Sequence, residues 1–197
     1  NQIVSLRSKR LVEKVVRELN HNIFYYIEGN VITTEAYKSS PILIEFITPD
    51  SIVHKVSKTL YVTPVSDTEF DLVDEQKNYQ KTHRIGEVIS HDGLQFSIIP
   101  RTGEEGSTFS RTRTVQINIV PVESMATYYS SSLTIGPKGK AADILSLGIV
   151  QPDSRKSEDF LNNLMFQFNE DGVADKRQVA GNTTEFIQQR LALITEE

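Results

Sequence analysis

The sequence predicts an α+β fold in which a mixed sheet packs with helices. Apolar residues recur at helical spacing near both ends of the chain, and between residues 59 and 120 they recur at every second position. The 197 residues, 38% hydrophobic and 24% charged, have the composition of a globular chain. We expect a base domain made of residues 1–58 and 112–197, a β-rich insert at 59–111, and a long C-terminal helix that is truncated by the chain end.

The first element predicted is an amphipathic helix over residues 3–19. Val4, Leu11, Val15 and Leu19 recur at helical spacing, and a basic set lies on another face. The stretch at 21–40 is polar and aromatic, which favours irregular chain. A strand is then predicted at residues 42–47, between two prolines.

Period-two patterning predicts a run of short antiparallel strands in the middle of the chain. These strands are expected at residues 60–64, 69–73, 86–89, 94–98 and 115–119. Asp92-Gly93 lies between two of them, and both residues tolerate positive φ, so a two-residue hairpin turn is predicted there.

The last third of the chain is predicted to hold two helices and a strand pair. A short helix should follow Pro121, and strands at 133–135 and 144–150 should flank the Gly136 turn. Pro152-Asp153-Ser154 predicts the start of the final helix. Gly172 and Gly181 leave two alternatives, a break in that helix or one long, weakly packed helix. Its later stripe of Phe186, Ile187, Leu191 and Ile194 is expected to pack on a helix outside this chain.

Charge and cysteine content exclude several functions. A net charge of −5 argues against nucleic-acid binding, and zero cysteines exclude disulfides, thiolate zinc sites and cysteine nucleophiles. No histidines are paired at the i, i+4 spacing of a helical metal site, and the Gly136-Pro-Lys-Gly-Lys-Ala segment lacks the spacing of a phosphate loop. Ser107 has no nucleophile elbow around it. We therefore predict no catalytic, cofactor-binding or metal-binding residue, and no enzymatic activity.

Three weaker signals keep alternatives open. Asp74-Glu75 or Glu104-Glu105 would suit a glycosidase pair, but adjacent loop carboxylates are more often solvated. A basic face at Arg7, Arg10, Lys14 and Arg17 would suit lipid phosphates, sugar-linked phosphates or an acidic neighbouring subunit, or be simply solvated. Tyr25, Tyr26, Tyr128 and Tyr129 would suit stacking on sugars, or capping of the core.

The order of segments resembles that of polysaccharide chain-length determinants, the Wzz-like polysaccharide co-polymerases. The segments that carry the resemblance are residues 4–19, 37–44, 144–153, the helix with Phe160 and Leu164, and 175–191. The β-rich middle looks like the insert of the larger members, which carry a cytoplasmic tyrosine autokinase.

The resemblance implies the periplasmic, extracytoplasmic domain of an inner-membrane protein of capsule or exopolysaccharide export. It implies a non-catalytic homo-oligomeric ring, for example an octamer, that regulates polymer length beside a polysaccharide polymerase and the export machinery. The parent chain would be membrane-anchored and would contact polysaccharide. Two alternatives stay open: an extracytoplasmic carbohydrate-binding or adhesion module, and a glycan-processing enzyme.

Overall fold

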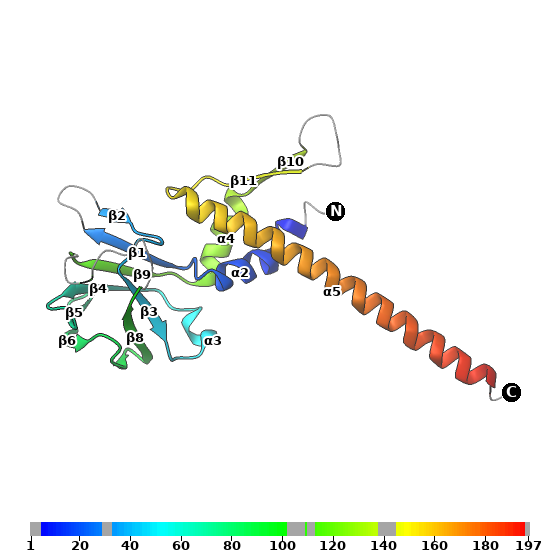
Figure 1. Cartoon of the computed structure of the whole chain (residues 1–197), viewed down its shortest axis with the longest axis horizontal. Coiled ribbons are helices and arrows are strands. Elements are labelled where there is room, and N and C mark those ends of the chain that lie inside the picture. The colour runs from blue at the N-terminus through cyan, green and yellow to red at the C-terminus, as the bar shows by residue number, and fades with distance from the viewer. Residues whose placement is uncertain (1–4, 29–32, 102–108, 110–112, 138–144, 196–197) are drawn as a thin grey trace.

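The computed structural model describes residues 5–28, 33–101, 109, 113–137 and 145–195, with side chains up to residue 190. Figure 1 shows a β subdomain at one end, a group of helices beside it, and one long helix that projects away from both. Two hydrophobic cores correspond to the first two parts, one between the sheets and one between the helices. The predicted α+β class is confirmed.

A six-stranded antiparallel sheet forms one layer of the β subdomain. Its order is β2 (Thr33–Glu35), β1 (Ile23–Glu28), β9 (Val115–Ile119), β4 (Lys58–Pro64), β5 (Glu69–Asp74) and β6 (Gln80–Arg84). In β9 and β5, buried residues alternate with half-buried ones, as the period-two pattern predicts.

A three-stranded sheet forms the second layer. It contains β3 (Ile42–Phe46), β8 (Leu94–Pro100) and β7 (Ile89–His91), in that order. Phe70 and Leu72 of the first sheet, and Phe96 and Ile98 of the second, are fully buried in one cluster between the layers. A short helix, α3 (Asp50–Val53), connects β3 to β4.

The second core lies between three helices and a small ribbon. The helices are α2 (Lys9–Glu18), α4 (Val122–Ser132) and α5 (Ser154–Thr195), and the ribbon pairs β10 (Thr134–Pro137) with β11 (Leu145–Gly148). The Ser8 side chain caps α2 by accepting a hydrogen bond from the Leu11 amide. Val12, Val15 and Val16 face the core from α2 without solvent exposure.

The final helix is continuous, which decides between the two alternatives left by the sequence. It runs for 42 residues through Gly172 and Gly181, and would be about 63 Å long at the usual rise. Phe160 and Leu164 in its first turns are fully buried, whereas every side chain from 172 to 190 is exposed. The helix therefore has an anchored first part and a projecting second part.

Three details differ from the sequence predictions. The stretch at 21–40 is not irregular, because β1 pairs with β9 through residues 23–27 and buries Tyr25. Residues 86–88 belong to a turn rather than a strand, and Gly86 has φ +78° there. An unpredicted strand, β6, has exposed polar residues on both sides of His83, so its hydrophobic pattern is too weak to detect.

The predicted boundaries of the insert, 59 and 111, do not coincide with the two cores. Strands β1 and β9 come from outside that range, yet both belong to the same sheet as β4, and β9 lies between β1 and β4. The strands of the β subdomain therefore follow one another in the chain from β1 to β9, and the helices of the second core come before and after them.

The predicted hairpin at Asp92-Gly93 is confirmed, and it gives a test of stability. Asp92 has φ +48° and Gly93 φ +75°, and β7 pairs with β8 across them. We expect Gly93→Val to lower the free energy of unfolding by about 1–2 kcal/mol, because a β-branched residue is strained at positive φ. Gly93→Asn is the matched control, since Asn tolerates this conformation. Equal stability of the two variants in urea denaturation would contradict this account.

Candidate functional site

Two adjacent sets of hydrogen-bonded polar side chains, buried or half-buried, lie where the helices meet β1 and β2; we call them together the waist network. It comprises His21 after α2, Glu35 of β2, Tyr37 after β2, Tyr129 of α4, and Lys156 and Asp159 of α5. These residues are up to 138 positions apart in the sequence, from His21 to Asp159. The network therefore exists only in the folded chain.

The hydrogen bonds of the network run in one direction. Tyr37 donates to the Asp159 carboxylate at 2.7 Å, because a carboxylate can only accept. The Tyr37 oxygen then accepts from Nε2–H of His21 at 2.9 Å. This leaves Nδ1 of His21 to accept from the Tyr129 hydroxyl, at 3.0 Å. His21 is therefore neutral and is held in one tautomer.

The surroundings of His21 oppose protonation. Burial, together with the nearby Lys156 and Lys38 charges, outweighs the attraction of Asp159 and lowers the pKa of His21 to about 3. The ring is 1% exposed and stacks on Tyr129, with ring centroids 5.8 Å apart. Burial also raises the pKa of Tyr37, as does its hydrogen bond to Asp159. Neither group is poised for proton transfer near neutral pH.

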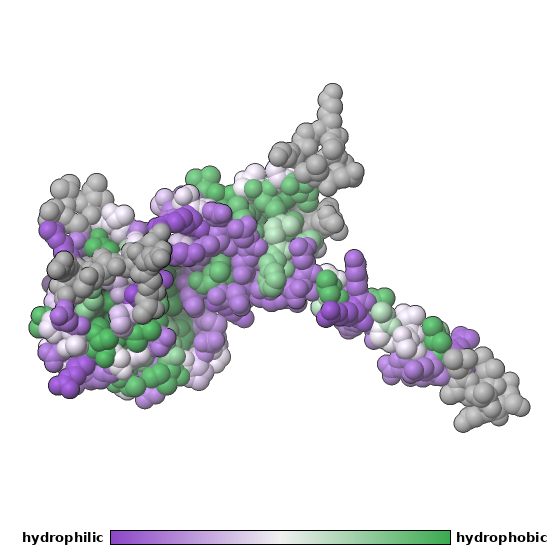
Figure 2. Space-filling view, in the orientation of Figure 1, coloured by the Kyte–Doolittle hydropathy of each residue, from purple (hydrophilic) through white to green (hydrophobic). Residues whose placement is uncertain are grey.

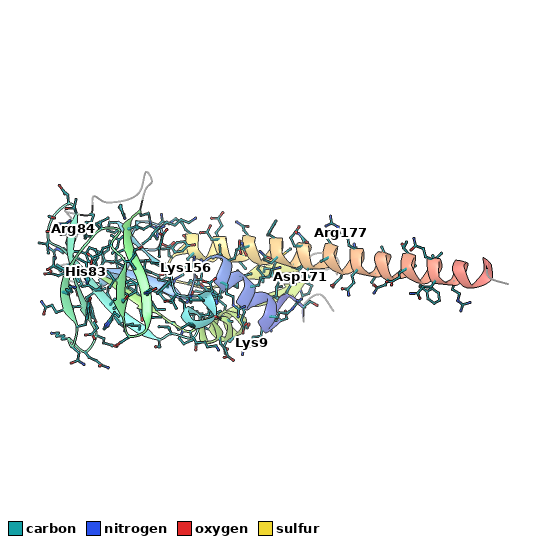
Figure 3. All side chains as sticks on the ribbon, turned by 90° about the horizontal axis from the view of Figure 1, so that it is seen from below. Lys9, His83, Arg84, Lys156, Asp171 and Arg177 are labelled. Atoms are coloured by element: carbon teal, nitrogen blue, oxygen red, sulfur yellow. The ribbon has the colours of Figure 1, made fainter. Side chains whose placement is uncertain are left out.

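Lys156 forms the second arm of the network. Its side chain is 3% exposed, and its ammonium group lies 2.5 Å from Oε1 of Glu35 and 3.7 Å from the centroid of the Phe24 ring. Burial lowers the pKa of Lys156, and the hydrogen bond to Glu35 partly opposes that shift. A buried cation with a carboxylate and an aromatic face as partners fixes α5 against β1 and β2. Figure 3 shows Lys156 at the start of α5, next to the β subdomain.

A groove of about 700 Å³ opens beside Asp159 and is the place where a ligand could reach the network. Its two basic groups are already engaged. Lys38 pairs with Asp159 at 2.8 Å, and Arg101 donates to the backbone carbonyls of Ser40 and Tyr37. These two basic groups of the groove therefore hold the fold together.

A second titratable cluster lies in the β subdomain around His83, which Figure 3 labels. His83 is buried between the Tyr79 hydroxyl, at 2.7 Å, and Glu87, at 3.0 Å. Hydrogen bonds from the Arg84 amide and from His83 lower the pKa of Glu87. Over the part of the chain that the structure describes, no three His, Asp or Glu residues are grouped closely enough to hold a metal ion.

The helix α5 is also held at a second level, at Asp171, which is farther along the helix than the waist network. Asp171 pairs with Arg10 at 3.0 Å and with Lys14 at 3.1 Å, both from α2. The predicted basic face of the first helix is thus turned partly toward this chain's own acidic residue. Lys9 likewise pairs with Glu123 of α4. Figure 3 shows Asp171 and Lys9 near α2, and Arg177 farther out on the helix.

The other candidate residues from the sequence analysis lie in different parts of the chain and differ in burial. Tyr129 and Tyr25 are buried and cap the cores, whereas Tyr128 is 48% exposed. Asp74 is buried, where its carboxylate accepts from the Tyr79 amide, and Glu75 is exposed beside it. Glu104-Glu105, Ser107 and most of the Gly136 turn lie outside the described residues. The sequence analysis missed the waist network because the residues that hydrogen-bond in it are far apart in the sequence.

Comparisons with known proteins give no family for this chain. No family model and no curated protein matches it. Two solved structures of Xanthomonas campestris FlgL, in space groups H3 and C2, match with 12% identity and a TM-score of 0.26. They cover 82% and 83% of this chain, and the chain covers 46% and 54% of theirs, so it spans about half of their length. A likeness this low carries no argument about fold or function.

The assignment to polysaccharide chain-length determinants is wrong: no family model and no curated protein supports it, and the solved structures named above are of FlgL. The physical reason is that the segments behind it are packing patterns. A basic amphipathic helix, a proline before a strand, and a polar turn before a helix occur wherever helices pack on sheets. The expectations of capsule export and an associated tyrosine kinase depended on that family and are withdrawn with it. The oligomeric ring and the extracytoplasmic location at the inner membrane are tested by none of these comparisons and stay predictions. Among the described helices, none combines the length and apolar character of a membrane span.

The waist network predicts a pH dependence of stability that passes through His21. Its pKa is about 3 in the folded chain against 6.5 ordinarily, so between these values only the unfolded chain binds the proton. We expect the free energy of unfolding to fall by about 2–4 kcal/mol as the pH is lowered from 7 to 4. His21→Gln should be less stable at pH 7, yet lose less on acidification.

The control for this titration is His54→Gln, because His54 is half-buried outside the network. It should keep the pH dependence of the unmodified chain. Urea denaturation at several pH values measures all three proteins, and parallel curves for the unmodified chain and His21→Gln would contradict a neutral His21.

Proposed function

We propose that this chain is a non-catalytic structural module, in which a folded head holds a long helix as a rigid arm for assembly. The head comprises the two cores, and the arm is α5 from residue 172 to its end. One observation carries the proposal. The first part of α5 is held in the head by several independent contacts, and the second part projects with its side chains in solvent.

The contacts that hold the helix are spread along its axis. Near its start, Phe160 stacks on Tyr129 with ring centroids 4.2 Å apart, and Lys156 pairs with Glu35. At the other end of the attached part, Asp171 pairs with Arg10 and Lys14 of α2. These two levels are about 22 Å apart along a helix. Two separated points of attachment fix the direction of a rod, which one point would leave free to swing.

The levels differ in strength. The ion pairs of Asp171 are exposed, with Arg10 84% accessible, so each contributes no more than about 1 kcal/mol. The aromatic packing and the buried network at the first level contribute more, because truncating a buried aromatic residue costs about 3–5 kcal/mol. The first level therefore contributes most of the stability of the attachment, and the second level adds a further constraint on the direction of the helix.

The absence of catalysis is part of the proposal. In the described residues, the candidate acids and bases of the waist already hydrogen-bond to each other, and His21 is neutral and buried. Assembly as a homo-oligomer and an extracytoplasmic location remain predictions from the sequence. Two of the four tyrosines that favoured a carbohydrate-binding module, Tyr25 and Tyr129, are buried in the cores.

The rigidity of the arm is testable with two spin labels, since the chain has no cysteine of its own. Lys81→Cys in β6 and Gln188→Cys on the arm place one label on each part. We expect a single narrow distance distribution, measured with labelled chains diluted in unlabelled ones. Adding Asp171→Asn should broaden it while the head stays folded. A broad distribution in the chain with Asp171 intact would overturn the rigid-arm proposal.

If the module is non-catalytic as proposed, the purified chain should neither hydrolyse ATP nor cleave polysaccharides. The assay is product release over hours, compared between the unmodified chain and Asp159→Asn. Asp159 is chosen because it is the network carboxylate that lines the groove. Turnover that disappears in Asp159→Asn would show that the groove is an active site and would contradict this function.

A further inference from the structure

The carboxylate pair Asp74-Glu75 lines an open pocket of about 540 Å³ in the β subdomain; we call it the hairpin pocket. It lies between three segments: α3 with the start of β4, the turn from β5 to β6, and the hairpin from β7 to β8. A third carboxylate, that of Asp92, comes from the hairpin. The apolar part of the lining is Ile52, Val56 and Leu94. The pocket therefore combines negative charge with an apolar wall.

The charges that line the hairpin pocket do not balance. Its three carboxylates are accompanied by one ammonium group, that of Lys58, which hydrogen-bonds to Asp92. Glu75 is exposed, and within the described part of the chain it has no ion-pair partner. Lys77 belongs to the same turn as Glu75 but does not line the pocket. Two negative charges are therefore uncompensated, before any charge on His91 is counted.

A buried imidazole points at two of these carboxylates without a hydrogen bond. The His91 side chain is 10% exposed, and its Nε2 lies 3.7 Å from Oδ2 of Asp74 and 3.6 Å from Oδ2 of Asp92. Both distances are too long for a hydrogen bond, so Nε2 has no such partner among the described residues. Oδ1 of Asp74 accepts from the Tyr79 amide at 3.1 Å, but within the described residues its Oδ2 accepts no hydrogen bond. A buried carboxylate usually has more donors than this.

We propose that the hairpin pocket binds a cationic side chain, lysine or arginine, of a partner protein. The charged end supplies the positive charge and the N–H donors that Asp74 and Glu75 lack. The aliphatic stem of the same side chain packs on the apolar wall, as the stems of lysine and arginine commonly do. This inference goes beyond the proposed function and does not depend on the arm, because the pocket lies entirely in the β subdomain.

The surroundings of the pocket favour a protein over a small cation. A metal ion does not fit, because the described His, Asp and Glu residues are not grouped closely enough to hold one. Ile52 and Ile47 are 51% and 52% exposed, and the Ile47 amide donates to the carbonyl of Gln95, next to Leu94 of the lining. A protein partner covers such apolar side chains, which a small cation leaves in water. Figure 2 shows hydrophobic surface beside hydrophilic surface on the β subdomain.

The first experiment titrates the whole chain with Nα-acetyl-lysine methylamide and follows its backbone amides by NMR at neutral pH. We expect saturable shifts at residues 52–59, 74–76 and 92–94, with a Kd of about 1 mM for this single charged contact. The norleucine analogue has the stem without the charge and should cause no saturable shift. A tripeptide with leucine on both sides of lysine should bind about fivefold more tightly, because about 40 Å² of further apolar burial gives that ratio.

The second experiment repeats the titration on three variants. Asp74→Asn keeps the acceptor for the Tyr79 amide and removes the charge, and it should weaken binding at least about tenfold. Glu75→Gln changes an exposed side chain, so it keeps the test valid if Asp74→Asn does not fold, and it should weaken binding about threefold. Asp67→Asn is the matched control, because it removes the same charge from an exposed loop outside the pocket. It should bind as the unmodified chain does.

Each outcome decides the inference. No saturable shift with the lysine compounds, or equal binding of the norleucine analogue, would overturn it. Equal affinities of Asp67→Asn, Glu75→Gln and Asp74→Asn would overturn it as well. Calcium chloride or 1,4-diaminobutane binding at the same amides more tightly than the tripeptide would show a small cation as the ligand, against a protein partner. The rigid arm is judged by the spin-label distances alone, so the two proposals fail separately.

Discussion

The packing of the first turns of α5 into the head is the contact on which the rest of the structure depends. Phe160 belongs to the helical core, where it stacks on Tyr129 and lies near His21, and all three are buried. Without these turns the helical core would lose Phe160 and Leu164, and Glu35 of β2 would lose its partner Lys156. Because this one stretch of helix contacts both parts, the head behaves as one body and the arm has a direction.

Burying polar groups at this junction is costly unless each is satisfied. The waist network meets the condition by a one-way chain of donors that ends on Asp159, whose charge Lys38 balances. This arrangement needs a neutral imidazole, and burial provides one. An apolar junction would hold the helix too, but it would not specify which face of α5 meets Tyr37. We infer that the network contributes orientation more than net stability.

The failed family assignment and the proposed function depend on different kinds of information. Segment order reflects which elements pack on which, and this is shared by unrelated α+β proteins. The exposed apolar residues of the arm, by contrast, are a feature that the fold itself leaves unexplained, because Phe186 and Ile187 remain 58% and 51% exposed even with Arg190 over the Phe186 ring. Surface that is exposed without an internal reason is better evidence of a partner than the order of buried segments.

The sequence by itself determined the fold class, the hairpin at Asp92-Gly93, the strands β3, β4, β5, β8 and β9, and the start of the final helix. These follow from local rules, since periodicity and turn chemistry act over a few residues. Tertiary structure alone decided the membership of β1 and β6 in the sheet and the waist network. Strand pairing and burial join residues that are far apart in the chain, so no local pattern could bring His21, Tyr129 and Asp159 together.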